Sequence, residues 1–304
     1  MNNKIVIVGC GNVGMSYAYT LINQRTKVTD LILIDINQDK TRGEAMDLNH
    51  GLAFAPSKIK IRVGDYNDCA DAQIVCLCAG ANQAPGESRL DLVQKNYDIF
   101  KGIVQSVVNS GFKGLFLIAT NPVDIMTYFT FKISGFPSSK VIGTGTTLDT
   151  ARLRFLISER LKINSKNIHG YILGEHGDSE FPSWSNSSVG AVEIPRFLSR
   201  GELDIMTDKV RSAAQEIIKA KGATYYGIGM VLARLTNAIL DDENSIFTVS
   251  SYNQNSDLYI GYPTIIGKSG VVGYVPLTLN DEEKKAFDNS ARIIKETISK
   301  VNQE

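Results

Sequence analysis

The sequence predicts an α/β protein: a Rossmann-type, doubly wound parallel sheet followed by an α+β domain. Short β-branched runs alternate with helical segments through the first half of the 304 residues. Glycines at the spacing G-x-G-x-x-G follow the first run, and the alternation stops after Leu148. Alternating β and α segments are typical of parallel sheets covered by helices on both faces. We therefore expect one domain at residues 1–145 and a second at 146–304.

The first domain has six predicted strands. They are the apolar runs KIVIVG, LILID, KIKIRV, QIVCLCAG, GLFLIAT and KVIGTG. Helical segments separate most of them, so each connection returns the chain to the same edge and the strands run parallel.

The second domain begins with a predicted helix, LDTARLRFLISERL, followed by IHGYILGEHGDS and two helices around Leu203–Leu240. Three predicted strands follow, namely IFTVSSY, LYIGYPTIIG and VVGYVPLTL. A closing helix begins at Asn280, because the acidic DEE that comes next suits the positive end of a helix dipole. We find neither repeats nor a long linker, so the two domains should pack together.

Composition points to a small-molecule ligand. Lysine plus arginine and aspartate plus glutamate number 32 each, which argues against nucleic acid or an anionic membrane as partner. The N-terminus lacks the pattern of a secretory signal, and no apolar run approaches the ~18 residues that span a bilayer. We expect a cytoplasmic protein whose cysteines, Cys10, Cys69, Cys76 and Cys78, are reduced core thiols rather than disulfides or metal ligands.

The glycine-rich loop indicates a dinucleotide cofactor. Gly9 permits the tight turn, Gly11 lets the backbone approach a pyrophosphate, and Gly14 allows the helix to pack on the strand. The next strand ends in Asp35, placed where such folds bind the adenine ribose hydroxyls. A carboxylate there repels a 2′-phosphate, and Ile36–Gln38 offers no cation to accept one, so NAD is favoured over NADP. The alternative is that Asp35 is a solvated residue at a strand end.

Three histidines are available as a general acid or base. We interpret His50 and His169 as structural. His176 lies in GEHGDS, where the flanking glycines leave the imidazole accessible, so it is the candidate catalytic group.

Five ordered segments carry a resemblance: GANQAPGESRLDLVQKN, TNPVD, LDTARLRFL, GEHGDSEFP and KGATYYGIG. From the first strand to the last helix, the chain resembles the L-lactate/malate dehydrogenase family, and within it the bacterial NAD-dependent L-lactate dehydrogenases. The resemblance implies hydride transfer between NADH and pyruvate in glycolysis and fermentation. It implies NAD in the first domain, the 2-oxo or 2-hydroxy monocarboxylate in the second, and a homotetramer.

The same resemblance assigns the catalytic groups. His176 matches the proton donor and Asp149 the acid that orients it. Arg152, three residues after Asp149 on the same helix face, matches the arginine that binds the substrate carboxylate through two hydrogen bonds. Arg89 matches a loop arginine that polarises the substrate carbonyl once the loop closes.

Further contacts follow from the resemblance. Asn121 in TNPVD matches a residue that contacts both the nicotinamide side and the substrate oxygen. Thr224 and Ile228, four apart on one predicted helix face, match the pocket wall and an apolar nicotinamide contact. The remaining positions assigned to the cofactor are Asn12, Val13 and Gly80. No metal ion is expected.

Substrate choice depends on Gln83. Malate-specific relatives place an arginine there, since a second buried carboxylate needs a cation. Neutral Gln83 favours pyruvate and disfavours malate dehydrogenase activity. Ala84 is smaller than the lysine often found beside the glutamine, so longer 2-oxo acids stay an alternative. The other alternative is a non-catalytic NAD-binding protein of the same fold, which predicts loss of one or more of the four catalytic groups.

The sequence differs from the family pattern at a position that the resemblance links to allosteric control. Many bacterial relatives are activated by fructose 1,6-bisphosphate, through an arginine that Arg154 matches and a histidine in a WSHA-like segment. Here the segment is WSNSS, and Asn186 replaces the histidine. Asparagine cannot neutralise a phosphate, so we expect weak or absent activation, with any anion site at Arg154 left open.

Overall fold

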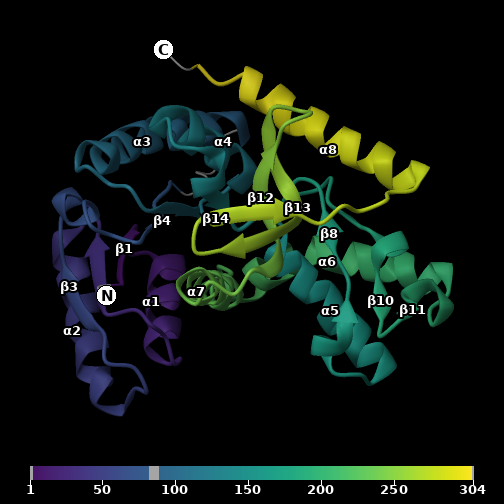
Figure 1. The fold of residues 1–304 in the computed structure, drawn as a ribbon, viewed down its shortest axis with the longest axis horizontal. Helices are drawn as coiled ribbons and strands as arrows, with labels where there is room; N and C mark the ends of the chain where they lie inside the picture. Colours follow the sequence, from purple (N-terminus) through teal and green to yellow (C-terminus); the bar gives the residue numbers. More distant parts are fainter. Residues whose placement is uncertain (1–2, 82–88, 303–304) are drawn as a thin grey trace.

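A mostly parallel sheet forms the centre of the molecule in the computed structural model, which describes residues 3–81 and 89–302 (Figure 1). The first half contributes the parallel strands β1 (Lys4–Val8), β2 (Asp30–Ile34), β3 (Lys60–Val63), β4 (Ile74–Leu77), β5 (Leu115–Ile118) and β6 (Val141–Gly143). Their order across the sheet is β3-β2-β1-β4-β5-β6. All six predicted strands and the doubly wound topology are therefore confirmed.

Helices cover both faces of this sheet. Those of the first half are α1 (Asn12–Ile22), α2 (Gln38–Gly51), α3 (Arg89–Asn109) and α4 (Val123–Ser134). In β1, Val6 and Val8 pack into a core that includes Phe129 of α4, whereas Ile5 packs into the opposite core. Successive side chains of a strand point to opposite faces, so both faces of a buried strand must be apolar.

The second half mixes helices and short strands. Its helices are α5 (Thr147–Leu161), α6 (Arg200–Lys221), α7 (Tyr226–Leu240) and α8 (Asp281–Ser299). Its strands are β7 (Ile168–His169), β8 (Ile172–Leu173), β9 (Phe181–Pro182), β10 (Ser188–Val189), β11 (Val192–Glu193), β12 (Ser245–Asn253), β13 (Leu258–Gly267) and β14 (Gly270–Tyr274). A third core, between α5 and α6, contains Leu153, Ile157 and Leu203.

The two halves share one sheet. Strand β12 continues it antiparallel to β6 through the pair Ser250 and Gly143, and β13 and β14 complete the edge. Helix α7 lies against α1, where the hydroxyls of Tyr17 and Thr236 are 2.5 Å apart. The expectation that the halves pack together is confirmed. Because β6 and β12 are neighbours in the sheet, they bring together segments that are far apart in the sequence.

Two predicted boundaries have different outcomes. Helix α8 begins where expected: the Asn280 side chain accepts from the Glu283 N–H at 2.9 Å, and the Glu283 carboxylate accepts from the Asn280 N–H at 3.2 Å. The predicted strand VVGYVPLTL is too long, because β14 ends at Tyr274. Pro276 has no N–H to continue the ladder.

The four cysteines have free thiols, as expected. The sulfur atoms of Cys76 and Cys78 lie 3.6 Å apart, which confirms that they share a face. Among the residues that the structure describes, no helix combines the length and apolarity that a membrane span requires.

Candidate active site

His176, which is half-buried, and Asp149, which is buried, form a hydrogen-bonded pair at the junction of the two halves. Asp149 lies in the first turn of α5 and is 1% exposed, and His176 lies between β8 and β9. The Nδ1 of His176 is 2.6 Å from one oxygen of Asp149. The Nη1 of Arg152 donates to the other oxygen at 2.6 Å, across one turn of the helix. The three residues predicted to act together are therefore neighbours.

The charge of His176 and the charge of Asp149 depend on each other. Burial opposes the positive charge on His176, but the Asp149 carboxylate outweighs burial and raises the pKa of His176 to about 9. Burial also opposes the negative charge on Asp149, yet His176 and then Arg152 hold its pKa below the ordinary value. The imidazolium and the carboxylate thus stabilise each other at neutral pH.

A second carboxyl, Asp124, fixes the backbone at His176. The N–H of His176 donates to Asp124 Oδ2 at 2.8 Å, and the hydroxyl of Ser250 in β12 donates to Asp124 Oδ1 at 2.5 Å. Asp124 is 2% exposed, and burial raises its pKa to about 6 against these two hydrogen bonds. The sequence assigns no role to Asp124 of TNPVD, because its partners are far away along the chain.

Glu180 is another buried acid to which the sequence assigns no role. It is buried within GEHGDSEFP, and its carboxyl, that of Asp149 and the imidazole of His176 have polar atoms within 4.8 Å of one another. Burial first, and the Asp149 charge second, raise the pKa of Glu180 to about 9. A spacing of this kind is compatible with an ion, but His176 Nδ1 and Arg152 already engage Asp149, so we interpret the cluster as a proton-holding site.

The glycine-rich loop has the shape of a dinucleotide cradle. Gly9 adopts φ +103°, and a Cβ there would lie 2.3 Å from the backbone nitrogen of Ala79. A Cβ on Gly14 would lie 2.1 Å from the carbonyl oxygen of Gly9 and 3.2 Å from the Ile7 side chain of β1, so the helix packs on the strand as predicted. Gly11 has open space at its Cβ position, which leaves room for a phosphate at the N-terminus of α1. Asn12 and Val13 form the first turn of that helix.

Asp35 follows β2, and its carboxylate is oriented by the backbone. Its Oδ2 accepts from the Cys10 N–H at 2.7 Å, and its Oδ1 accepts from the Asn37 N–H at 2.9 Å. Asp35 therefore contacts the glycine-rich loop itself. Gly80 follows β4 at the same edge of the sheet, and a Cβ there would lie 2.7 Å from the Thr120 side chain. These positions fit a cofactor with free ribose hydroxyls.

Asn121 is exposed at the carboxyl end of the neighbouring strand β5, and its carbonyl oxygen accepts from Asn96 at 3.2 Å.

The prediction that Thr224 and Ile228 share a helix face is wrong. Helix α6 is terminated by Gly222 in the left-handed conformation, so Thr224 lies in the connection and Ile228 in the first turn of α7. Both are half-buried.

The predicted specificity residues Gln83 and Ala84 lie outside the described residues. Arg89 begins helix α3, but its side chain is not part of what the structure describes.

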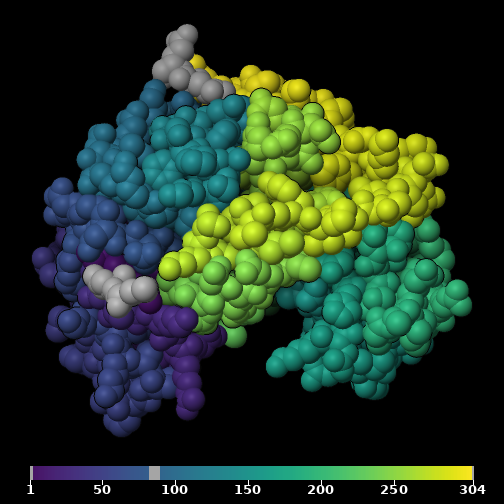
Figure 2. Space-filling model, in the orientation of Figure 1, coloured from purple at the N-terminus to yellow at the C-terminus, as the bar shows by residue number. Residues whose placement is uncertain are grey.

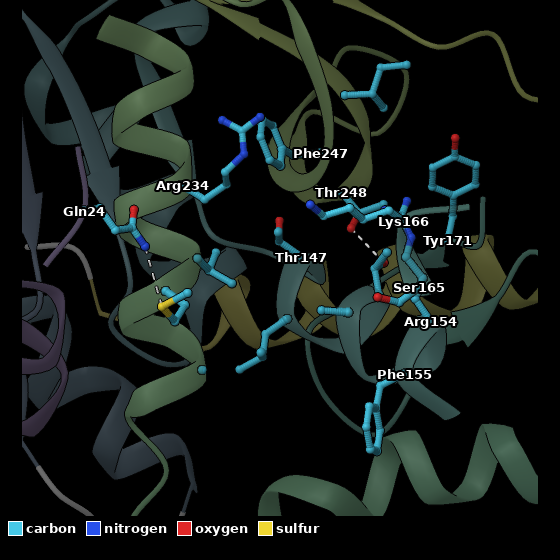
Figure 3. Close-up of a pocket in the computed structure, with 17 residues that line it drawn as sticks. Gln24, Thr147, Arg154, Phe155, Ser165, Lys166, Tyr171, Arg234, Phe247 and Thr248 are labelled. Atoms are coloured by element: carbon cyan, nitrogen blue, oxygen red, sulfur yellow. Dashed lines mark hydrogen bonds between the residues drawn. The ribbon is translucent and has the colours of Figure 1, made fainter. Parts of the chain in front are cut away.

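A separate cavity of about 550 Å³ opens between α5, α7 and β12, where the space-filling view is hollowed (Figures 2 and 3). Its lining includes Thr147, Arg154, Tyr171 and Phe247, but none of the catalytic cluster. Arg154 donates from Nε to the Gly170 carbonyl at 3.2 Å, and its guanidinium lies 5.7 Å from the Tyr171 ring centre. This cavity is not the catalytic site.

A dinucleotide cradle in the first half and an imidazole paired with a buried carboxylate beside an arginine in the second define an NAD-dependent oxidoreductase. The chain belongs to the lactate/malate dehydrogenase family. A model of the NAD-binding domain of lactate/malate dehydrogenases matches residues 3–143, and a model of their α/β C-terminal domain matches residues 146–304.

Similar proteins cover nearly the whole chain. An L-lactate dehydrogenase of Bacillus pumilus is 53% identical over 98% of this chain and 97% of its own length, and one of Bacillus licheniformis is 53% identical over 96% and 95%. The crystal structure of the minor L-lactate dehydrogenase from Enterococcus mundtii with ligands bound has a TM-score of 0.97 at 45% identity, covering 100% of this chain and 99% of that one. The lactate dehydrogenase MGS-M5, from a Medee basin deep-sea metagenome library, has a TM-score of 0.96 at 49% identity, with 98% of each chain covered.

Proposed function

We propose that this chain is an NAD-dependent L-lactate dehydrogenase that interconverts pyruvate and L-lactate, with residues 1–145 binding the cofactor and 146–304 the substrate. The observation that carries the proposal is the cluster in which Asp149 holds both His176 and Arg152 at 2.6 Å. It places a proton donor and a guanidinium side by side, which are the two groups that a 2-oxo acid needs for its carbonyl and its carboxylate.

In pyruvate reduction, bound NADH supplies the hydride. His176 donates its Nε2 proton to the substrate oxygen, since Nδ1 is engaged by Asp149. Asp149 fixes the orientation of the ring and favours the imidazolium that begins the step. In lactate oxidation the neutral imidazole takes the proton back.

Arg152 binds the substrate carboxylate with the guanidinium nitrogens that Asp149 leaves available. Its side chain is 14% exposed, so water competes weakly for that contact. We assign polarisation of the carbonyl to Arg89 and a further substrate contact to Asn121 and Thr224. Gly9, Gly11, Asn12, Val13, Gly14, Asp35, Gly80, Asn121 and Ile228 are assigned to NAD.

Gln83 supports pyruvate over oxaloacetate, because a neutral amide leaves a second carboxylate without a cation. The residue types His176, Asp149, Arg152 and Arg89 are all present, which argues against the non-catalytic alternative. Malate and longer 2-hydroxy acids stay alternative substrates.

Association into a homotetramer is part of the proposal. Large apolar side chains are exposed in two places. Around the cavity between α5 and α7, Phe155 is 60%, Met230 54% and Ile246 46% exposed. On α2 and in the turn that follows it, Met46 is 59% and Phe54 94% exposed. Clustered apolar surface of this kind favours contact between copies. Light scattering after size-exclusion chromatography tests the assembly, and dissociation by Phe155→Glu would locate it.

The free thiols favour a reducing compartment, so we propose a cytoplasmic location.

We also propose weak or absent activation by fructose 1,6-bisphosphate. The Asn186 amide nitrogen already donates to Ser183, Ser185 and the carbonyl of Thr278 at 2.9 to 3.0 Å.

The deciding experiment is NADH oxidation by the purified chain with pyruvate, oxaloacetate and 2-oxoisocaproate side by side. We expect the highest kcat/KM with pyruvate. Preference for oxaloacetate would support malate dehydrogenase, and binding of NADH without turnover of any of the three would support the non-catalytic alternative.

A further inference from the structure

Glu180 lies beside the catalytic pair but has no part in the reaction as proposed above. It is 3% exposed, directly before β9, in the segment that carries His176. Its carboxyl, the Asp149 carboxyl and the His176 imidazole all have polar atoms within 4.8 Å of one another. So close to the reacting groups, this carboxyl is either another negative charge or a proton donor.

The surroundings of Glu180 favour the protonated form. Two buried carboxylates in contact repel each other, so one of them keeps its proton. Asp149 is the ionised member, because it accepts from His176 and Arg152 at 2.6 Å each. Glu180 is 3% exposed and has a carboxylate oxygen within 4.8 Å of this ionised group, so Glu180 is the member that keeps the proton.

The charged groups of the described residues that act most strongly on this carboxyl come from two places. Asp149 and Arg152 come from α5, and His176 comes from the same segment as Glu180. Arg211 of α6 also reaches the segment, but its guanidinium donates to the backbone carbonyl of Glu180 at 2.7 and 3.0 Å. Burial and Asp149 raise the pKa of Glu180 to about 9, close to that of His176.

We propose that Glu180 is a positioning residue that must be protonated, together with His176, for pyruvate to bind and be reduced. This inference rests on the proposed function. With Glu180 neutral, the cluster of His176, Arg152 and Asp149 carries one net positive charge, which matches the single carboxylate of a monocarboxylic substrate. Ionised Glu180 cancels that charge, so the substrate carboxylate is no longer attracted.

The consequence is an alkaline loss of activity that involves two protons. If both His176 and Glu180 must hold a proton, log kcat/KM for pyruvate falls with a limiting slope of about −2 at high pH. If His176 alone matters, the slope is about −1. A residue that serves packing alone changes the height of this profile but not its slope.

The test compares the wild type with Glu180→Gln, in which the amide keeps the size and the donor but cannot ionise. Glu159→Gln, an exposed change on α5, is the matched control. We expect a slope of about −2 for the wild type and the control and about −1 for Glu180→Gln. Above the midpoint of the alkaline fall, the ratio of the variant's kcat/KM to that of the wild type should therefore rise about tenfold for each pH unit. A wild-type slope of about −1, or an unchanged slope in Glu180→Gln, would overturn the inference.

A second measurement does not depend on the variant folding or on turnover. The infrared carbonyl absorption of a protonated buried carboxyl should be present in the wild type at neutral pH and disappear as the pH rises through about 9. If it is missing at neutral pH, the inference fails whatever the activity. If it is present but pyruvate is not reduced at any pH, the proposed function fails instead.

Discussion

The backbone N–H of His176 donates to the carboxylate of Asp124, a residue 52 positions earlier in the chain, at 2.8 Å. Asp124 belongs to the first turn of α4, and its other oxygen accepts from Ser250 of β12. One buried carboxyl thus joins the helix that follows β5, the strand that continues the sheet and the loop that carries His176.

Asp124→Ala should destabilise the protein and misplace His176. Two donors lose their acceptor, the N–H of the half-buried His176 and the buried hydroxyl of Ser250, and an unsatisfied buried donor costs about 1–3 kcal/mol. We expect a lower melting temperature and a lower kcat/KM for pyruvate, with the dissociation constant of NADH nearly unchanged. Asp124→Asn, which keeps one acceptor oxygen, should be less severe, and the exposed Asp288→Ala serves as a control. An Asp124→Ala variant with wild-type stability would contradict the role of these hydrogen bonds.

His176→Asn should bind NADH almost as the wild type does while reducing pyruvate slower by a factor of ~10² or more, because proton transfer is lost. Stopped-flow measurement of NADH oxidation and a fluorescence titration of NADH separate the two effects. An equal loss in both would mean that His176 serves the cofactor.

The stability that His176 contributes should depend on pH. Its pKa of about 9 in the folded chain lies above the ordinary 6.5, so the contribution is complete below about 6.5 and disappears as the pH rises through about 9. Thermal melting of the wild type against His176→Asn should show a difference that shrinks over this range. A difference that grows toward high pH would reverse the assignment of charge.

Pyruvate should exceed oxaloacetate by more than tenfold in kcat/KM, which requires ~1.4 kcal/mol of discrimination in the transition state. Gln83→Arg should shift preference toward oxaloacetate by supplying a cation for the second carboxylate. Steady-state kinetics with both substrates checks this. If Gln83→Arg leaves the ratio unchanged, another residue recognises the distal group.

Fructose 1,6-bisphosphate at millimolar concentration should leave the pyruvate saturation curve nearly unchanged near neutral and mildly acidic pH. Asn186→His supplies the second cation that the family's bisphosphate site uses besides the arginine that Arg154 matches. It should lower the half-saturation concentration when the bisphosphate is present, most clearly at mildly acidic pH. A several-fold fall with the wild type would show that Arg154 and other donors suffice.

The sequence by itself predicted the strands of the first half, their parallel arrangement and the candidate catalytic pair. The strand runs are buried on both faces, so their apolar character is continuous and visible in the chain. Asp149 and Arg152 lie one helical turn apart, which is a local relationship that spacing can predict. His176 was identified by its motif, and the glycine-rich loop by the turn that its glycines permit.

Tertiary structure decided the rest. The contact of Asp124 with His176 and Ser250, and that of Glu180 with Asp149, join segments that the sheet brings together, so their spacing in the sequence carries no signal. Thr224 looked helical because propensity does not reveal that Gly222 ends α6. The protonation of Glu180 depends on burial and on a neighbouring charge, and both exist only once the chain has folded.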